Sequence, residues 1–146
     1  MTTIYLAGPI KGLTLAGAVE WRDAFARHLS HVRCLSPLRG KQRLEDVGVI
    51  TGCYEANPLT SAKGVTCRDF WDVRRCDLVV ANLLDAQSVS IGTVLELGAA
   101  HALNKPIVLI MEPDNLHEHP MLQEIAGFVV NNLEDAIDLV GDICDR

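Results

Sequence analysis

Glu96 is the residue whose surroundings point most directly to chemistry, because it lies near the start of an apolar helical stretch that contains two glycines. Thr93 and Glu96 have the spacing of a capping box, in which the carboxylate occupies the third helical position. The same position suits a nucleophile, since the dipole and free amides of a first helical turn favour an ionised carboxylate. Gly92 and Gly98 would let a ligand and a neighbouring element approach closely. The pattern leaves both roles of Glu96 open.

Asp69 and Asp72 form a second group of carboxylates, and their i, i+3 spacing places them on one face of a helix. The structural interpretation is a solvated face on which Arg68 pairs with Asp72. The functional interpretation turns one of them toward Glu96, because retaining cleavage of a glycosidic bond uses two carboxylates roughly 5–5.5 Å apart. Tyr5 is either a packed strand aromatic or a phenol that orients the nucleophile.

Several weaker motifs have an ordinary structural interpretation beside a functional one. The stretch from Gly8 to Gly12 is glycine-rich but matches neither a Walker loop nor a dinucleotide fingerprint, so a turn is expected. Ser88 and Ser90 precede a helix, where they could cap it or present amides to a phosphate. His117 and His119 are expected in a solvated loop, and without a third ligand nearby we expect no metal.

The composition indicates one globular domain, spanning 1–146, that handles a small molecule. The chain has 146 residues, of which 49% are hydrophobic and 22% charged, and its net charge is -6. We therefore expect neither a nucleic acid polymer nor a membrane as partner. The five cysteines form no CxxC pair and no signal peptide is expected, which together favour a cytoplasmic protein with reduced thiols.

Apolar periodicity predicts alternating short strands and helices. The expected strands are Thr3–Ala7, Val32–Leu35, Asp77–Asn82, Ile107–Met111 and Phe128–Val130, and the expected helices are Leu15–Leu29, Thr66–Arg75, Thr93–Leu103, Pro120–Ile125 and Leu133–Cys144. The first helix has an apparent apolar face at Ala18, Trp21, Phe25 and Leu29. Residues 37–65 lack periodicity, and we expect a long excursion that contains one short helix at most. We also expect this excursion to cover the ligand.

This order predicts an α/β fold, namely a flavodoxin-like, doubly wound sheet of five parallel strands with helices on both faces. Ligands bind such sheets beyond the carboxyl ends of the strands, at the point where the strand order reverses. We therefore expect three stretches to converge on the site: Gly8–Ile10, Asn82–Ser90 and Glu112–His119.

Four motifs in this order resemble the nucleoside 2-deoxyribosyltransferase family. They are Ile4–Pro9 (IYLAGP), Asp69 followed by Asp77–Asn82 (DLVVAN), Gly92–Gly98 (GTVLELG) and Asn104–Pro106 (NKP), so the match covers most of the chain up to about Pro120. The resemblance implies that Glu96 attacks C1′ of the deoxyribose, that Asp69 contacts the base and shuttles its proton, and that Tyr5 positions the nucleophile. Further substrate contacts are expected from Gly8, Pro9, Asp72, Asn82, Ser90, Gly92 and Met121.

The resemblance also implies an activity: base exchange between 2′-deoxynucleosides in nucleoside salvage, with no cofactor. Homo-oligomers are typical of the family, and a neighbour's loop, here about His119–Leu122, completes the site. Ser90 departs from the aspartate that some transferases carry, and it resembles instead the serine of nucleoside 5′-monophosphate N-glycosidases. Hydrolysis of a monophosphate is therefore one alternative, although only Lys11 and the basic stretch 39–43 could hold a phosphate. A non-catalytic nucleotide-binding domain is another.

Overall fold

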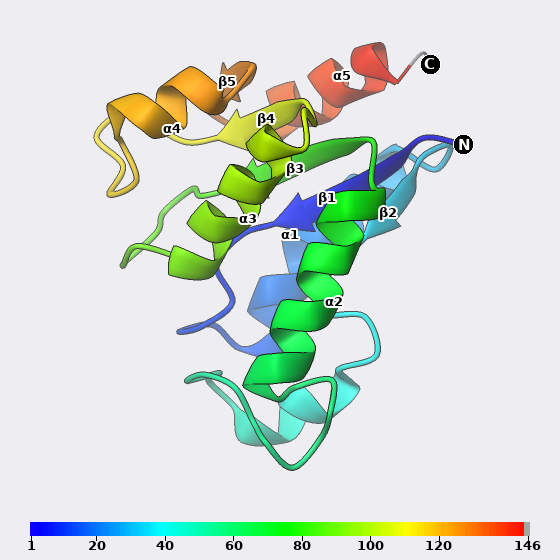
Figure 1. The fold of residues 1–146 in the computed structure, drawn as a ribbon, viewed down its shortest axis with the longest axis vertical. Coiled ribbons are helices and arrows are strands. Elements are labelled where there is room, and N and C mark those ends of the chain that lie inside the picture. The colour runs from blue at the N-terminus through cyan, green and yellow to red at the C-terminus, as the bar shows by residue number, and fades with distance from the viewer. Residues whose placement is uncertain (145–146) are drawn as a thin grey trace.

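The computed structural model describes residues 1–144 and has a central parallel sheet between two layers of helices (Figure 1). Within these residues the strands lie in the order β2-β1-β3-β4-β5. The strands are β1 (Thr3–Ala7), β2 (Arg33–Leu35), β3 (Leu78–Asn82), β4 (Ile107–Ile110) and β5 (Phe128–Val130). The helices are α1 (Leu15–His28), η1 (Gln42–Val47), α2 (Ala62–Arg75), α3 (Ile91–Ala102), α4 (Pro120–Ile125) and α5 (Leu133–Ile143).

The predicted α/β fold is confirmed, and the strands form where short apolar runs are covered on both faces. In register, Ile4 of β1 pairs with Leu78 of β3, and Val80 of β3 pairs with Val108 of β4. Such continuous aliphatic runs are typical of parallel strands, because helices bury both faces of the sheet.

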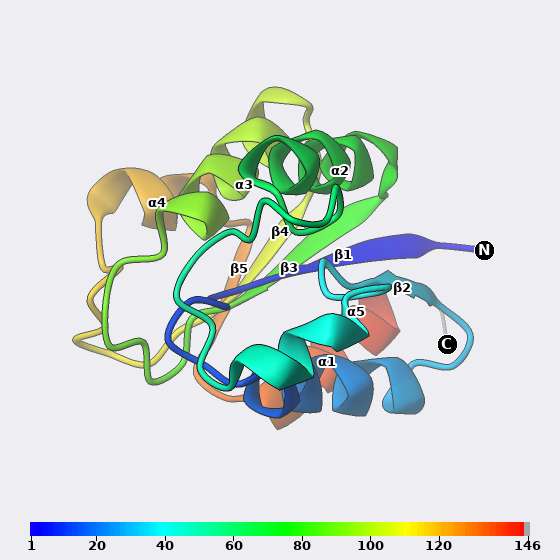
Figure 2. The same ribbon diagram turned by 90° about the horizontal axis from the view of Figure 1, so that it is seen from below.

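Two groups of helices cover the two faces of the sheet (Figure 2). On one face, α2, α3 and α4 pack against Tyr5 and Val79 through side chains such as Leu97. On the other face, α1 and α5 pack against the alternate strand residues through side chains such as Phe25 and Val140. The alternation along β1 therefore directs the Tyr5 side chain toward the layer of α2 and α3.

Two helices begin earlier than the sequence predicts, and in both cases a serine is the N-cap residue. α2 begins at Ala62 because the Ser61 hydroxyl accepts the Gly64 N–H at 3.0 Å. α3 begins at Ile91, directly after Ser90. The other predicted element bounds agree with the structure to within about one residue.

The excursion between β2 and α2 is a packed segment with the single short helix η1. Its apolar side chains Leu38, Leu44 and Ile50 form a small core with Leu15 and Ala18 of α1. Its backbone is tied to the loop after β1, since Gly12 N–H donates to Ile50 O at 2.7 Å and Ile50 N–H donates to Leu13 O at 2.8 Å. The segment is therefore held as a fixed wall beside the carboxyl ends of β1 and β3.

None of the helices within residues 1–144 combines the length and apolar character needed to cross a bilayer.

Candidate active site

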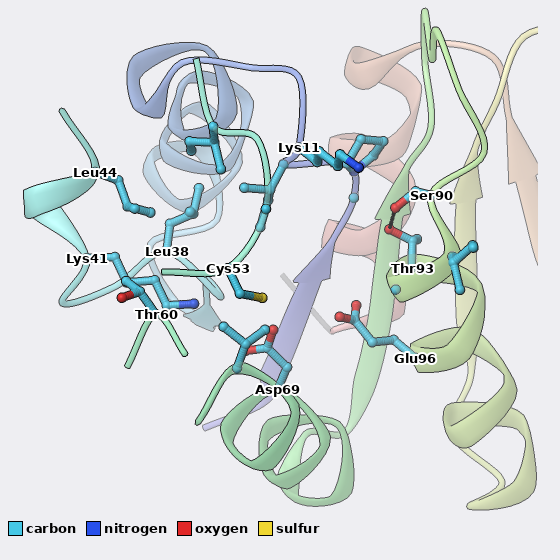
Figure 3. A pocket seen from close by; sticks show the side chains of 18 of the residues that line it. Lys11, Leu38, Lys41, Leu44, Cys53, Thr60, Asp69, Ser90, Thr93 and Glu96 are labelled. Carbon is cyan, nitrogen blue, oxygen red and sulfur yellow. Dashed lines mark hydrogen bonds between the residues drawn. The ribbon is translucent and has the colours of Figure 1, made fainter. Parts of the chain in front are cut away.

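A pocket of about 430 Å³ lies at the carboxyl ends of β1 and β3, where the strand order reverses. Three segments line it: the loop after β1, the excursion with the adjoining part of α2, and the segment that leads into α3 (Figure 3). Of the three stretches expected to converge here, 8–10 and 82–90 contribute to the lining, whereas 112–119 does not. The lining residues of the sequence-predicted set are Gly8, Pro9, Asp69, Ser90, Gly92 and Glu96.

Glu96 lies in the second turn of α3 and faces the pocket. The expected capping box with Glu96 at the third helical position is wrong, because Ser90 is the N-cap residue and Thr93 occupies that position instead. The Ser90 and Thr93 hydroxyls are hydrogen-bonded to each other at 2.8 Å. Glu96 is thus free of any capping role, and its carboxylate is available to a ligand.

The environment of Glu96 raises its pKa to about 8, and burial is the largest cause. The charge of Asp69 raises this pKa further, whereas Tyr5, Arg22 and Lys41 lower it. The expectation that a helix N-terminus keeps Glu96 ionised is therefore wrong. Desolvation dominates because Glu96 lies beyond the first turn, where the effect of the helix dipole has fallen off.

Asp69 of α2 points toward Glu96 from the opposite side of the pocket (Figure 3). It is buried, and its Oδ1 atom has no hydrogen-bond partner within the described residues. Burial raises its pKa to about 6, against the lowering effect of Lys41 and Arg68. Asp69 therefore ionises before Glu96 as pH rises, and its charge then raises the pKa of Glu96.

Tyr5 is fully buried in the middle of β1, next to the two carboxyl groups. Its pKa is raised by burial first and then by the charges of Glu96 and Asp69. Its hydroxyl is buried without a hydrogen-bond partner among the described residues, and it lowers the pKa of Glu96 as a neighbouring donor would.

Arg22 is a buried cation beside the site that the sequence reasoning missed. Only 1% of it is exposed, and it donates to the backbone carbonyls of Leu6, Ala18 and Gly8, the first and last at 3.1 Å. Burial lowers its pKa to about 10, while the charges of Tyr5 and Glu96 raise it. The available signal was an arginine at the fourth residue after Ala18, on the buried side of α1.

Gly8 lines the pocket directly after β1, and its lack of a side chain lets the backbone there lie close to Asn82, the last residue of β3. A Cβ atom there would lie 2.8 Å from the Asn82 carbonyl oxygen, closer than a side chain tolerates. Asn82 itself does not line the pocket, and its side chain accepts the Leu84 N–H at 3.1 Å. Gly92 lines the pocket with open space around it, and Gly98 likewise has no atom near its missing Cβ.

Asp72 and Met121 also lie outside the pocket lining. Asp72 is fully buried and forms ion pairs with Arg39 at 2.6 Å and Arg75 at 2.7 Å, so the prediction of a solvated face with an Arg68 pair is wrong. Arg68 instead donates to the carbonyl oxygens of Pro37 and Arg39. Met121 projects from α4 with 73% of its surface exposed.

The loop after β4 supports the start of α3 from behind. The Ser90 N–H donates to Nε2 of His117 at 2.7 Å, and Nδ1 of that imidazole donates to Asn115 Oδ1 at 2.9 Å. The Asn115 amide donates to Leu83 O at 2.7 Å. His117 is thus buried, and the prediction that it is solvated is wrong, whereas His119 is exposed. Among residues 1–144 no cluster of side chains suits a metal ion.

The family model described as nucleoside 2-deoxyribosyltransferase matches residues 4–139 of this sequence. The chain belongs to the nucleoside 2-deoxyribosyltransferase family. The resemblance inferred from the motifs is thereby confirmed. The family consists of enzymes that transfer or hydrolyse the glycosyl group of nucleosides, acting on nucleosides or nucleotides and bases. A search of curated proteins gives no match to the sequence.

Three solved structures share the fold. A conserved protein from Enterococcus faecalis V583 has a TM-score of 0.69 at 19% identity, covering 98% of this chain and 99% of that chain. The CMP N-glycosidase BcmB of Clostridium botulinum has a TM-score of 0.61 at 15% identity, covering 97% and 99%. BlsM has a TM-score of 0.60 at 20% identity, covering 99% and 94%. At such identities these likenesses establish the fold alone.

Proposed function

We propose that this protein is a nucleoside 2-deoxyribosyltransferase that exchanges the base of 2′-deoxynucleosides through a covalent deoxyribosyl-Glu96 intermediate. The observation that carries the proposal is a pair of carboxyl groups, Glu96 and Asp69, that face one pocket from different helices (Figure 3). Their pKa values, about 8 and about 6, leave one proton on the pair near neutral pH. Glycosidic chemistry requires one carboxylate and one proton donor.

The first half-reaction uses the two groups in opposite roles. Asp69 in its protonated form gives its proton to the departing base, which takes the electron pair of the glycosidic bond and leaves neutral. The ionised Glu96 donates an electron pair to C1′ and forms an ester with the deoxyribose. A base whose acceptor atom faces Asp69 favours the proton on that residue, which leaves Glu96 ionised.

The second half-reaction reverses the first with a new base. The incoming base attacks C1′ while the Asp69 carboxylate accepts its proton, and Glu96 leaves as a carboxylate. Water in the same position would give free sugar instead. The excursion wall, with Leu38, Leu44 and Ile50 lining the pocket, favours transfer because apolar side chains exclude water.

A second candidate, hydrolysis of a nucleoside 5′-monophosphate, is supported by Ser90 and Lys11. Both line the pocket, and Figure 3 shows them together at the end away from Asp69. The amides at the start of α3 and the Lys11 ammonium would suit a phosphate. Arg39 is engaged with Asp72, and Arg43 does not line the pocket, so the basic stretch contributes only Lys41 to the lining.

We also propose a homo-oligomer in which a neighbouring subunit completes the site. Large apolar side chains are exposed on α3 and α4, among them Ile91 at 70%, which lines the pocket, Leu95 at 56% and Met121 at 73%. Exposed apolar groups that gather near a site are typical of a protein interface. Met121 would then reach the ligand of a neighbouring subunit.

Product analysis by chromatography tests these proposals. The enzyme is incubated with 2′-deoxyinosine plus adenine, and separately with dIMP or dCMP alone. We expect 2′-deoxyadenosine with little free sugar; free base released only from the monophosphates would favour the hydrolase instead. Glu96→Ala should lower turnover by at least roughly a thousandfold.

The Glu96→Ala variant should remain folded. A carboxyl whose folded pKa is raised stabilises the protein below its unfolded pKa, and this contribution is lost as pH rises through about 8. Near pH 8 the Glu96 carboxyl contributes little of this stabilisation, so its removal in Glu96→Ala should not lower the melting temperature measured at that pH. Near-wild-type turnover in a folded variant would refute the nucleophile and favour a different role for the domain.

A further inference from the structure

Lys41 is a buried cation in the pocket that the proposed reaction leaves without a task. Only 5% of the residue is exposed, yet its side chain makes no hydrogen bond or ion pair with any residue of the described part of the chain. Burial lowers the pKa of its ammonium, with Arg68 and Arg39 adding to that effect and Asp69 opposing it. The Lys41 ammonium faces the pocket without a partner among these residues (Figure 3), so a hydrogen-bond acceptor on a bound ligand would pair with it there.

The position of Lys41 in the pocket indicates that the acceptor of its hydrogen bond belongs to the base of the substrate. Its side chain extends from the excursion toward Asp69, whose pKa it lowers more than any other neighbouring charge does (Figure 3). Lys11 and Ser90 lie at the other end of the pocket, beyond Glu96. If Glu96 meets the anomeric carbon and Asp69 meets the base, the Lys41 amine reaches the same base from the excursion side.

We propose that Lys41 determines base specificity and selects bases that present a ring nitrogen acceptor next to a carbonyl oxygen. This inference rests on the proposed glycosidic function, in which the protonated Asp69 serves the ring nitrogen. Lys41 then donates to the neighbouring oxygen. The 6-oxopurines offer this pair at N7 and O6, and cytosine offers it at N3 and O2.

Competing bases are disfavoured because they carry an N–H donor at one of the two positions where the selected bases carry an acceptor. Adenine has an amino group in place of O6, so its N–H would face the Lys41 N–H groups, and neither donor would find an acceptor. Uracil carries a hydrogen on N3 and cannot accept a proton or hydrogen bond there. Sites that leave buried polar groups unpaired reject such analogues strongly.

The test compares kcat/KM for dIMP against dAMP and for dCMP against dUMP, and likewise for the nucleosides. Wild type should favour the first member of at least one pair roughly tenfold to a hundredfold, the size expected of a hydrogen bond to a charged group. The purine and pyrimidine pairs distinguish which of the two bases is used. Lys41→Met should remove most of this preference, and Lys41→Gln, whose amide can donate or accept, should bring the ratio near unity.

Lys63→Met is the matched control, because it removes the same charge from an exposed position on α2 and should leave the preference unchanged. Melting temperatures identify any variant that fails to fold. If Lys41→Met fails to fold, Lys41→Gln takes its place in the comparison. Unchanged selectivity in both folded Lys41 variants, or equal wild-type rates within both pairs, would overturn the inference while leaving the glycosidic function intact.

A binding measurement keeps the two proposals separable. Calorimetric titration of dIMP, dAMP, dCMP and dUMP into Glu96→Ala protein, with and without Lys41→Met, reports base selection without turnover. Selective binding lost with Lys41→Met supports the inference even if wild type shows no cleavage. Absence of selective binding overturns it whatever the reaction proves to be.

Discussion

At the scale of single residues, burial raises the pKa of both carboxyl groups of the proposed site, and neighbouring charges decide which of them holds the proton. Glu96 and Asp69 are both shifted upward by desolvation, but Asp69 has Lys41 and Arg68 close by and therefore ionises first. Its charge then keeps the proton on Glu96. The proposed reaction needs the reverse placement, so in this proposal the base itself must help to move the proton.

The pH dependence of kcat/KM should follow from this pair. We expect a bell-shaped profile with limbs near pH 6 and pH 8, which belong to the pair and not to either residue alone. Below the first limb both groups are protonated, so no nucleophile exists. Above the second both are ionised, so no proton donor remains. A profile that stays flat from pH 5 to 9 would contradict the shared proton.

Asp69→Asn should change the profile in a defined direction. Only Glu96 then titrates, and its pKa falls below about 8 because the charge of Asp69 no longer raises it, so the profile keeps one acidic limb and loses the basic limb. Turnover should fall roughly a hundredfold to ten-thousandfold because the proton donor is gone. Asp23→Asn, at an exposed position of α1, is the control and should keep the wild-type profile. A basic limb that persists in Asp69→Asn would exclude the shared proton.

At the scale of elements, the pocket depends on how tightly the excursion joins α2. The first turn of α2 packs so closely on the end of the excursion that a Cβ on Gly64 would lie 1.7 Å from the Pro58 carbonyl oxygen. Thr60, two residues after Pro58, lines the pocket and donates to the Tyr54 carbonyl at 2.7 Å. Displacement of this junction should therefore reach the site.

Gly64→Ala should destabilise the protein by roughly 1–3 kcal/mol, since backbone has to move to admit the methyl group. We also expect a lower fraction of transfer relative to hydrolysis, because a displaced excursion admits water to the intermediate. Thermal unfolding and product ratios measure the two effects. Gly98→Ala, with open space in α3, should instead be neutral or stabilise by up to about 1 kcal/mol. Equal behaviour of the two variants would show that the junction is not a constraint.

At the scale of the whole molecule, the sheet topology joins segments that are distant in sequence. The reversal of strand order between β1 and β3 opens the pocket that Gly8, Asp69 and Glu96 line. The chain carries a net charge of -6, yet Lys11 and Lys41 line this pocket. Local cations of this kind favour a polar or anionic ligand despite the overall charge.

The exposed apolar side chains of α3 and α4 predict association. Leu95→Arg should shift the protein toward the monomer in light scattering coupled to size exclusion, because a charge replaces an apolar contact at the proposed interface. Activity should fall with the oligomer if a neighbour completes the site. Ala16→Arg adds the same charge on α1, across the sheet, and should change neither. A monomeric wild-type protein with full activity would reject the oligomer.

The elements and their parallel arrangement could be predicted from the sequence, because apolar periodicity and turn residues act over a few neighbours in the chain. Motif order, and not the chemistry of the side chains, also led to the proposal of Glu96, Asp69 and Tyr5 as site residues, and two of them, Glu96 and Asp69, line the pocket. The raised pKa of Glu96, the burial of His117 and the positions of Arg22 and Lys41 became visible only in the folded structure. Desolvation, ion pairing and donor–acceptor contacts depend on groups far apart in sequence, which no local pattern records.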